Sequence, residues 1–409
     1  MKLMPHEPTS DPDRPSREGG PSKDAPASSG GDRLKVLLVA NVLTHYRLPL
    51  YEELQRHVDL ELVFFSNGRE WYWQRTEEPA TDTLANARWL RGWWVGGTRI
   101  TPGLLPVVWR SPADVIVKDL TGKFALPVTY LLARARRKPF ILWASLWEHP
   151  AHGIHRFTRP LMRHIYRRSN AVVTYGRHVS RHVIGEGARP ERVLVAPQAA
   201  RSLADSRPGA DRWQRPLRLL YVGRLETWKG PHVLLQALAR LGADVDWRLQ
   251  VAGSGSQEQH LAAEARRLGI GRRVDFLGHV PNDSLGGLYA SSAAVVVPSI
   301  RTASFSEPWA LVVNEAMQAG TLVIASDCVG AVQDGLVRNG ETGLVFRAGD
   351  VNSLAHRLAV VADAANTPSV RGIAEAGHDA ISGYSFSTAA RAFVAAANMA
   401  RDPACRRSP

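Results

Sequence analysis

The sequence predicts an α/β protein that contains two doubly wound parallel sheets in tandem. Short apolar runs, typical of buried strands, alternate with longer helical or loop stretches along most of the chain. A polar segment near the middle interrupts this alternation, which then starts again. Because the chain has 409 residues, it is long enough for two domains of ordinary size, each with its own core.

Each half of the chain contains six strand-like runs. In the first half we expect strands at 35–40, 60–65, 114–117, 140–144, 171–175 and 193–196. In the second half we expect strands at 217–222, 248–252, 274–277, 294–297, 322–325 and 343–346, with helices at 231–241, near 350–364 and near 386–400. Strand–helix–strand units of this kind form parallel sheets, which bind ligands at the carboxyl ends of their strands.

These patterns predict the domain boundaries. We expect a first domain at 34–199, a linker at 200–216, a second domain at 217–384, and a C-terminal helix at 385–400 that can pack back on the first domain. Residues 1–33 are rich in Pro, Ser, Gly and charge and should form a disordered tail, with a second short tail at 401–409. The N-terminal segment lacks the apolar core of a secretory signal, and the sequence has no run of 18 apolar residues.

The chain is strongly basic, with a formal net charge of +13 and a pI near 10.2. Arginine concentrates in the first half, at 131–139 and 155–182, where no acidic residue occurs. This excess of positive charge has three interpretations: binding to nucleic acid, binding to an anionic membrane surface, or basic faces that are simply solvated. The sequence has no helix-turn-helix, RNA-stacking or zinc-finger signature, so we expect no nucleic-acid partner. Membrane contact and solvated faces both remain open.

Only two cysteines occur, Cys328 and Cys405, too few for a disulfide framework. No Cys/His cluster indicates zinc. We therefore expect a reducing cytoplasmic location, with the inner face of the membrane as the place of any peripheral contact.

The segment FSEPWALVVNEAMQAG (305–320) places Glu307 and Glu315 eight residues apart. With Pro308 at the first helical position, eight residues of helix would separate the carboxylates by roughly 12 Å. At that distance the two carboxylates cannot share a proton, but they can bind the two ends of an elongated ligand that has hydroxyls at both ends. The N–H groups near Trp309, Ala310 and Leu311 would lie between them and suit a phosphate. The pattern indicates a nucleotide sugar; an amphipathic helix with one capping and one exposed glutamate is the alternative.

A second cluster follows the strand at 217–222. Gly223, Arg224, Lys229 and Gly230 occupy the loop before the helix that starts at Pro231. This loop must lie at the carboxyl end of its strand, where ligands bind in open α/β sheets. Arg and Lys both suit a diphosphate that gains negative charge as it leaves. A solvated basic loop is the alternative.

Taken together and in this order, the motifs resemble the family 4 glycosyltransferases, which have the GT-B fold. The matching segments are VGRLETWKG, LQVAGSGS, VDFLGHV, LYASSAAVVVPS, SEPWALVVNEAMQAG and VIASDCVGAVQDGLVRNGETGLVF, with looser matches at 34–54 and 171–198. The resemblance implies two Rossmann-like domains that face each other across a cleft. It also implies retaining transfer from a nucleotide diphosphate sugar, without a metal or another cofactor.

The resemblance also implies roles for single residues. Arg224 and Lys229 match the residues that hold the diphosphate, Glu307 matches the carboxylate beside the donor sugar, and Glu315 matches the carboxylate that binds the ribose. Gly253 lies in a glycine-containing turn that the family keeps near the donor. Taken alone, its GxG pattern is weak evidence for a dinucleotide site, since Glu258 occupies the third glycine position.

The first domain should supply the acceptor side of the site. His45, Tyr46 and Arg47 stand in the loop after the first strand, where many relatives have glycines. Arg47 either contacts phosphate through its side chain or faces solvent. The family often places a histidine near the donor sugar after the fourth or fifth strand of this domain. His149 is our first choice for that role, with His152 and His155 as alternatives.

Tryptophans are unusually dense between the second and third expected strands, at Trp71, Trp73, Trp93 and Trp94. Two roles remain open for these side chains. They either contact sugar or lipid, or pack in a core or an interface. Asp327 follows a strand, but a single aspartate without a DxD partner does not indicate a metal site.

The predicted activity is transfer of a sugar to an acceptor hydroxyl, the acceptor being a glycan, a lipid-linked molecule or a small metabolite. The alternatives are a GT-B-like protein that binds sugar or polyanion without catalysis, and a nucleotide-sugar epimerase. A phosphorylase would need a cofactor lysine or a phosphate site that the sequence does not reveal.

Overall fold

The computed structural model describes residues 33–66, 84, 86–148, 155–203, 210–302, 306–363 and 368–403. The predicted disordered tail at 1–33, apart from Arg33, and most of the tail predicted at 401–409 lie outside these ranges.

The first domain is built on a seven-stranded sheet, in which all neighbouring strands are parallel and the order is β3-β2-β1-β6-β7-β8-β9. Its strands are β1 (Lys35–Ala40), β2 (Asp59–Phe64), β3 (Ala87–Trp89), β6 (Val115–Asp119), β7 (Phe140–Ala144), β8 (Ala171–Thr174) and β9 (Val193–Val195). The central strands β6, β7 and β8 are buried at every position. This explains the mostly apolar sequences of these strands, since helices cover both faces of a parallel sheet, and the two charged residues at the end of β6, Lys118 and Asp119, form a buried ion pair.

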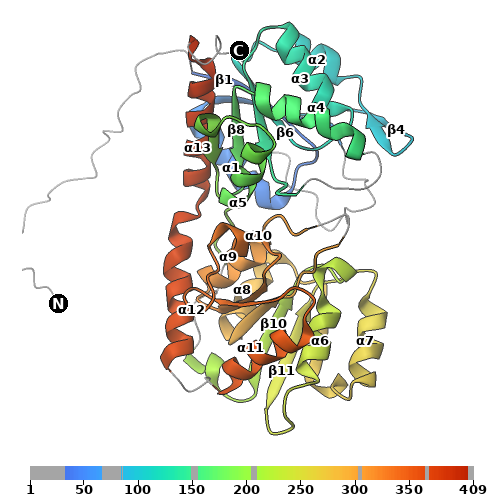
Figure 1. The fold of residues 1–409 in the computed structure, drawn as a ribbon, viewed down its shortest axis with the longest axis vertical. Helices are drawn as coiled ribbons and strands as arrows, with labels where there is room; N and C mark the ends of the chain where they lie inside the picture. The colour runs from blue at the N-terminus through green and yellow to red at the C-terminus, as the bar shows by residue number, and fades with distance from the viewer. Residues whose placement is uncertain are drawn as a thin grey trace, which may run out of the picture. The chain divides into compact units, whose positions relative to one another are not determined.

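Four crossover helices and one short helix connect these strands: α1 (Leu48–His57), α2 (Leu104–Arg110), α3 (Ala125–Ala135), α4 (His155–Arg168) and α5 (Arg177–Gly185). A separate antiparallel hairpin of β4 (Trp93–Val95) and β5 (Thr98–Ile100) precedes α2. Figure 1 shows this hairpin at the edge of the first domain, next to α2 and α3.

The second domain contains a six-stranded parallel sheet in the order β12-β11-β10-β13-β14-β15. Its strands are β10 (Leu217–Val222), β11 (Trp247–Ala252), β12 (Val274–Gly278), β13 (Ala294–Val297), β14 (Leu322–Ser326) and β15 (Leu344–Phe346). Its helices are α6 (Pro231–Leu238), α7 (Glu258–Arg267), α8 (Leu285–Ser291), α9 (Leu311–Gln318), α10 (Gly330–Asp334), α11 (Val351–Asp363) and α12 (Pro368–Ala380). Two buried apolar clusters flank this sheet.

The last helix, α13 (Phe386–Arg401), leaves the second domain and packs on the first, where it contacts α1, β7 and β8 (Figure 1). Ser385 caps its start, since the Ser385 hydroxyl accepts a hydrogen bond from the Thr388 N–H at 3.1 Å. Phe393 lies edge-on against Trp143 of β7, with ring centroids 5.1 Å apart. The helix thus completes the core of the first domain.

The predicted α/β fold of two doubly wound parallel sheets is confirmed. All twelve expected strands are present within two residues of their expected bounds, whereas β3, β4 and β5 were not expected. Leu203 and Trp213, both inside the expected linker at 200–216, are buried in the cores of the second domain.

Candidate functional site

A cleft of about 590 Å³ lies where the carboxyl ends of strands from both sheets meet. The first domain contributes residues after β1, β7 and β8, and the second domain contributes residues after β10, β11, β12 and β13. The cleft is lined by most of the predicted site residues: His45, Tyr46, Arg47, Gly223, Arg224, Lys229, Gly253, Glu307, Trp309, Ala310 and Leu311. The lining also includes four residues that no sequence motif predicted: Tyr175, Gln198, His279 and Asn282.

Lys229 and Glu307 form an ion pair in this cleft. Lys229 ends the short 3₁₀ turn Thr227–Lys229 after β10, and its Nζ donates to Glu307 Oε2. The Ser299 hydroxyl donates to the same carboxylate oxygen at 3.3 Å. The Glu307 side chain is only 8% exposed, whereas that of Lys229 is 21% exposed. The residue predicted to bind phosphate and the residue predicted to bind the sugar therefore lie next to each other.

The backbone around Glu307 is held from both domains. From the second domain, the Gly330 N–H donates to the Glu307 carbonyl at 3.0 Å. From the first domain, Trp147 Nε1 donates to the same carbonyl at 3.3 Å, and His178 Nε2 donates to the Pro308 carbonyl at 3.1 Å. These bonds fix the position of the Glu307 carboxylate relative to both sheets.

The helix that carries Glu315 begins at Leu311, so the prediction that Pro308 occupies its first position is wrong. The carbonyls of residues 307–309 accept hydrogen bonds from outside the helix, as for Trp309, which accepts from the Ala331 N–H at 3.2 Å. Ala310 then turns the chain with a φ of 75°, which a residue with a Cβ seldom adopts. Within the described residues, no acceptor is seen for the N–H groups of Leu311 and Val312, which start the helix beside the cleft.

Arg224 lies at the end of β10, on the same side of the cleft as Lys229. The Tyr221 hydroxyl donates to the Arg224 carbonyl at 2.8 Å, and the guanidinium lies 5.5 Å from the centre of the Trp228 ring. The neighbouring turn at Gly253 packs so closely that a Cβ there would overlap the Gly223 carbonyl oxygen. Gly253 thus fits the structural interpretation of the GxG pattern, a tight strand-to-helix turn.

Glu315 does not line the cleft, in contrast to the other donor-binding candidates. It lies one helical turn after Leu311 and so on the same face of α9. Its Oε2 accepts a hydrogen bond from the Tyr289 hydroxyl at 2.6 Å. Burial raises the pKa of the Glu315 carboxyl, and the hydrogen bond from Tyr289 offsets only part of this rise.

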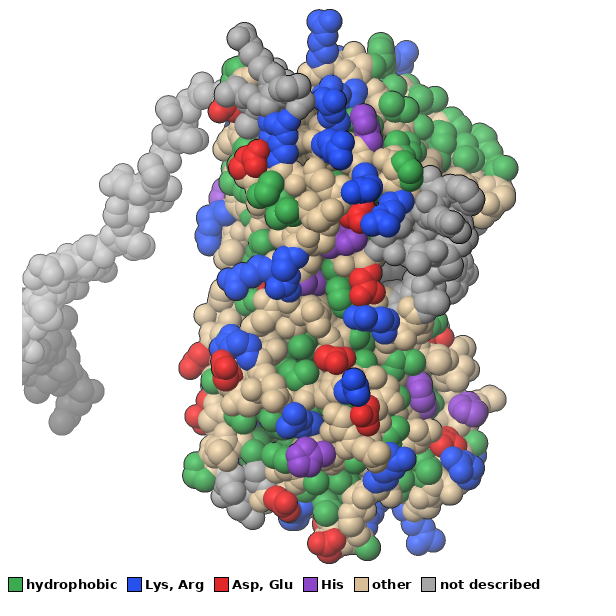
Figure 2. Space-filling view, in the orientation of Figure 1, with side chains coloured by type: hydrophobic (Ala, Val, Ile, Leu, Met, Phe, Trp, Pro, Cys, Tyr) green, Lys and Arg blue, Asp and Glu red, His purple; other side chains and the backbone are tan. Residues whose placement is uncertain are grey.

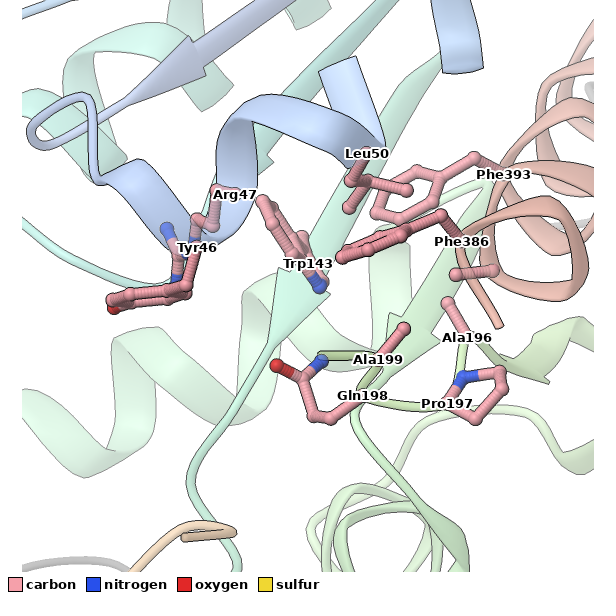
Figure 3. A pocket seen from close by; sticks show the side chains of 11 residues that line it. Tyr46, Arg47, Leu50, Trp143, Ala196, Pro197, Gln198, Ala199, Phe386 and Phe393 are labelled. Atoms are coloured by element: carbon pink, nitrogen blue, oxygen red, sulfur yellow. The ribbon is translucent and has the colours of Figure 1, made fainter. Parts of the chain in front are cut away.

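On the first-domain side, Arg47 points inward and not to solvent. Its guanidinium lies 4.5 Å from the centre of the Trp143 ring and donates to the Tyr175 hydroxyl. Figure 3 shows Arg47 beside Trp143, with Phe386 and Phe393 of α13 beyond the indole around a small cavity of about 20 Å³. Burial raises the pKa of the Tyr175 hydroxyl to about 12, so this phenol keeps its proton at neutral pH.

The first-choice histidine, His149, lies outside the described residues, as does His152, and the side chain of His155 is likewise not described. The histidine that the structure places near Glu307 is His178, which the sequence reasoning missed. Its Nδ1 lies 3.8 Å from Asp334 Oδ1, and the Tyr384 hydroxyl donates to Asp334 Oδ2 at 2.9 Å. Its position just after β8, a strand end, is the signal that could have found it.

Asp327, the aspartate considered for a metal, accepts a hydrogen bond from the Ala348 N–H at 3.0 Å. The described residues contain no group of three or more His, Cys, Asp or Glu side chains that could hold a metal ion.

The second domain also matches a known family. Residues 208–372 match the family described as glycosyl transferases group 1. This segment is therefore similar to a group 1 glycosyl transferase domain. Glycogen synthase of Mycobacterium tuberculosis is 37% identical over 149 residues, which are 36% of this chain and 34% of that protein. The D-inositol 3-phosphate glycosyltransferase of Streptomyces scabiei is 34% identical over 232 residues, 52% of this chain and 50% of that protein.

The chain thus spans about a third to a half of the length of these two relatives. Over its larger part it resembles the crystal structure of HepE from Anabaena in complex with UDP, with a TM-score of 0.69. That likeness covers 88% of this chain and 99% of HepE at 20% sequence identity. It establishes the GT-B fold, and the matched segment belongs to the second half of that fold.

Proposed function

We propose that the chain is a glycosyltransferase that moves a sugar from a nucleotide diphosphate sugar to an acceptor hydroxyl with retention of configuration. The observation that carries the proposal is the juxtaposition of Arg224, Lys229 and Glu307 in one cleft, beside the start of α9. This arrangement offers two cations and free helical N–H groups for a diphosphate, with a carboxylate at the position of the sugar.

In the proposed mechanism, Arg224 and Lys229 neutralise the diphosphate as the bond between the anomeric carbon and the phosphate oxygen breaks. The bonding electrons leave with the diphosphate, and the anomeric carbon gains oxocarbenium character. The acceptor oxygen attacks from the same face, and its proton passes to a departing phosphate oxygen. Glu307 positions the sugar and stabilises the developing positive charge.

Glu315 is proposed to bind the ribose hydroxyls. Leu311 and Glu315 lie on one face of α9, so a nucleoside seated against Leu311 comes within reach of the carboxylate. His45, Tyr46 and Arg47 line the opposite wall and are proposed to contact the acceptor. No metal or other cofactor is needed in this scheme, because the two basic side chains and the helix start supply the positive charge.

The first domain is proposed to contact an anionic membrane surface on the cytoplasmic side, where a lipid-linked or envelope glycan acceptor would be found. Helix α4 supports this, since Arg159, Arg163 and Arg167 line one open hollow on it. Glu186 pairs with two of these arginines, so the group keeps a net positive charge. No helix in the described part of the chain is long and apolar enough to span a bilayer.

A thermal-shift screen of the full chain against UDP, GDP, ADP and TDP sugars tests the proposal, since a bound ligand stabilises the folded state. UDP-glucose is the first donor to try, because HepE has been solved with UDP-glucose. With the donor found, EDTA should leave turnover unchanged. Loss of turnover in EDTA that Mn²⁺ restores would contradict the metal-free mechanism. A donor that binds without turnover on any acceptor would favour the non-catalytic alternative.

A further inference from the structure

The hairpin of β4 and β5 carries large apolar side chains that are exposed among the described residues. Trp93, Trp94 and Val95 are 57%, 49% and 55% exposed, so all three residues of β4 face solvent. A hairpin of a folded domain normally buries one face, and its residues then alternate between buried and exposed. None of these three residues lines the cleft.

The exposed surface continues onto the next element. Only the short turn Thr101–Gly103 separates β5 from α2, whose Leu105 and Trp109 are also exposed. Figure 2 shows hydrophobic side chains gathered at this edge of the first domain, at the upper right of the view. A half-exposed indole presents on the order of 100 Å² of mostly apolar surface. Several such side chains together reach the size of the largest apolar patch on a typical monomer, which is often an interaction site.

Basic residues outnumber acidic residues along the chain segments that form this surface. The sequence contains no Asp or Glu between residues 84 and 113, or between 120 and 147, whereas these stretches contain nine Arg and Lys residues. Arg99 lies directly across the hairpin from Trp94. Arg136, from the end of α3, donates to the carbonyls of Trp109 and of Ser111, so its charge lies at the end of α2. Arg99 donates to the Phe65 carbonyl at 2.8 Å, so among the described residues both guanidinium groups bond to carbonyls and not to a carboxylate.

We propose that this surface, the tryptophan hairpin with Leu105 and Trp109, inserts into the interfacial layer of an anionic lipid bilayer. Indole rings favour the level of the lipid headgroups, and arginines beside them are attracted to anionic lipids. The excess of basic residues along these segments disfavours a second copy of the chain as occupant, since two such faces would repel each other. The hairpin is thus the element that makes the membrane contact put forward under the proposed function, on which this inference rests.

Vesicle flotation of the full chain tests the proposal, with phosphatidylcholine vesicles compared with vesicles that contain phosphatidylglycerol as well. We expect binding to the anionic vesicles that weakens as salt is raised. The double substitution Trp93→Ala and Trp94→Ala should lower the partition coefficient by about tenfold or more. The substitution Leu277→Ala removes an exposed apolar side chain of the second domain and should leave binding unchanged.

A second readout reports insertion directly. Cys328 is buried, so a Val95→Cys variant on a Cys405→Ser background has a single exposed cysteine among the described residues for an environment-sensitive dye. The fluorescence emission of the dye attached at residue 95 should shift to the blue when the protein binds anionic vesicles. Nucleotide binding measured on the same preparations reports the state of the cleft separately, so failure of the membrane proposal and failure of the transferase proposal are distinguishable.

Three outcomes would overturn the inference. One is equal vesicle binding by the wild type and by the Trp93→Ala, Trp94→Ala variant, with both unfolding at the same temperature. Another is no binding of the wild type to either kind of vesicle. The third is self-association in sedimentation velocity that the double substitution abolishes, which would make the surface an interface between copies.

Discussion

Lys229 Nζ and Glu307 Oε2 form an ion pair between residues 78 positions apart in the sequence. The lysine expected to hold the leaving diphosphate thus neutralises the carboxylate expected at the sugar. We expect an incoming diphosphate to compete with Glu307 for the lysine. The Glu307 carboxylate should then keep the hydrogen bond from Ser299 but lose the cation that neutralises it, so that its negative charge can stabilise the positive charge on the sugar.

Replacement of Glu307 by Gln should therefore separate binding from transfer. Nucleotide affinity should change less than about threefold, because the amide keeps the shape of the side chain and leaves Lys229 available to phosphate. Turnover should fall by about 10²–10³-fold, the usual loss when one group that stabilises transition-state charge is removed. Single-turnover kinetics and titration of the free nucleotide diphosphate measure the two effects. A lowered affinity with unchanged turnover would reverse the assignment.

Glu315→Gln should give the opposite result. Because burial raises the pKa of Glu315, the folded state binds a proton more readily than the unfolded chain, and stability falls as pH rises through this range. Removing the charge should thus leave the melting temperature at pH 7 equal or higher, while nucleotide affinity falls about tenfold. Tyr289→Phe deletes the hydroxyl that donates to Glu315 and should lower stability by about 1 kcal/mol. Normal nucleotide binding by the Glu315→Gln variant would contradict the proposed contact between Glu315 and the ribose.

Gly330→Ala should disturb the site without touching a ligand. A Cβ at Gly330 would overlap the carbonyl oxygen of Pro308, so the segment that carries Glu307 must move. Overpacking of this kind typically costs about 1–3 kcal/mol of unfolding free energy, and transfer should fall at least tenfold. Gly287→Ala in α8 is the matched control, since a Cβ there meets nothing within 4 Å. Equal kinetics in the two variants would contradict the proposed support of Glu307.

Asp334 should stabilise the contact between the domains in a pH-dependent way. Burial alone would raise the pKa of Asp334, but the nearby His178 ring and the hydrogen bonds from Tyr384 and the Arg177 N–H outweigh it and hold the pKa below its ordinary value. The carboxylate therefore stabilises the folded state above about pH 4, and this contribution is lost as pH falls through the folded pKa.

We expect Asp334→Asn to lower the free energy of unfolding at pH 7 by about 1–3 kcal/mol and to lower it much less near pH 3. Urea unfolding at both pH values measures the difference, with Asp283→Asn as the control at an exposed aspartate. A loss that is the same at both pH values would show that the charge of Asp334 does not stabilise the fold.

Most of the fold could be predicted because its parallel strands are buried on both faces and read as continuous apolar runs. FILWA in β7 and AVVV in β13 are buried at every position. The strands β3, β4 and β5 were missed because each has three residues and carries exposed or half-buried Trp and Arg side chains without a periodic pattern.

The candidate site was predictable where its residues follow strand ends, as Arg224 and Lys229 do. The start of α9 was not, because hydrogen bonds from Gly330, Trp147 and His178 hold residues 307 and 308 out of the helix that Pro308 favours locally. The pairing of His178 with Asp334 depends on the packing of one domain on the other, which no local pattern encodes.

The most direct test of the account is titration calorimetry of nucleotide diphosphates into the wild type and into Arg224→Ala and Lys229→Ala variants. Both residues lie in a loop after β10, so the variants should fold. We predict that one of UDP, GDP, ADP and TDP binds the wild type with a dissociation constant below about 100 µM. Each substitution should weaken that binding by about tenfold or more, through loss of a charged contact to phosphate. Binding of no nucleotide, or equal binding by all three proteins, would contradict the proposed donor site.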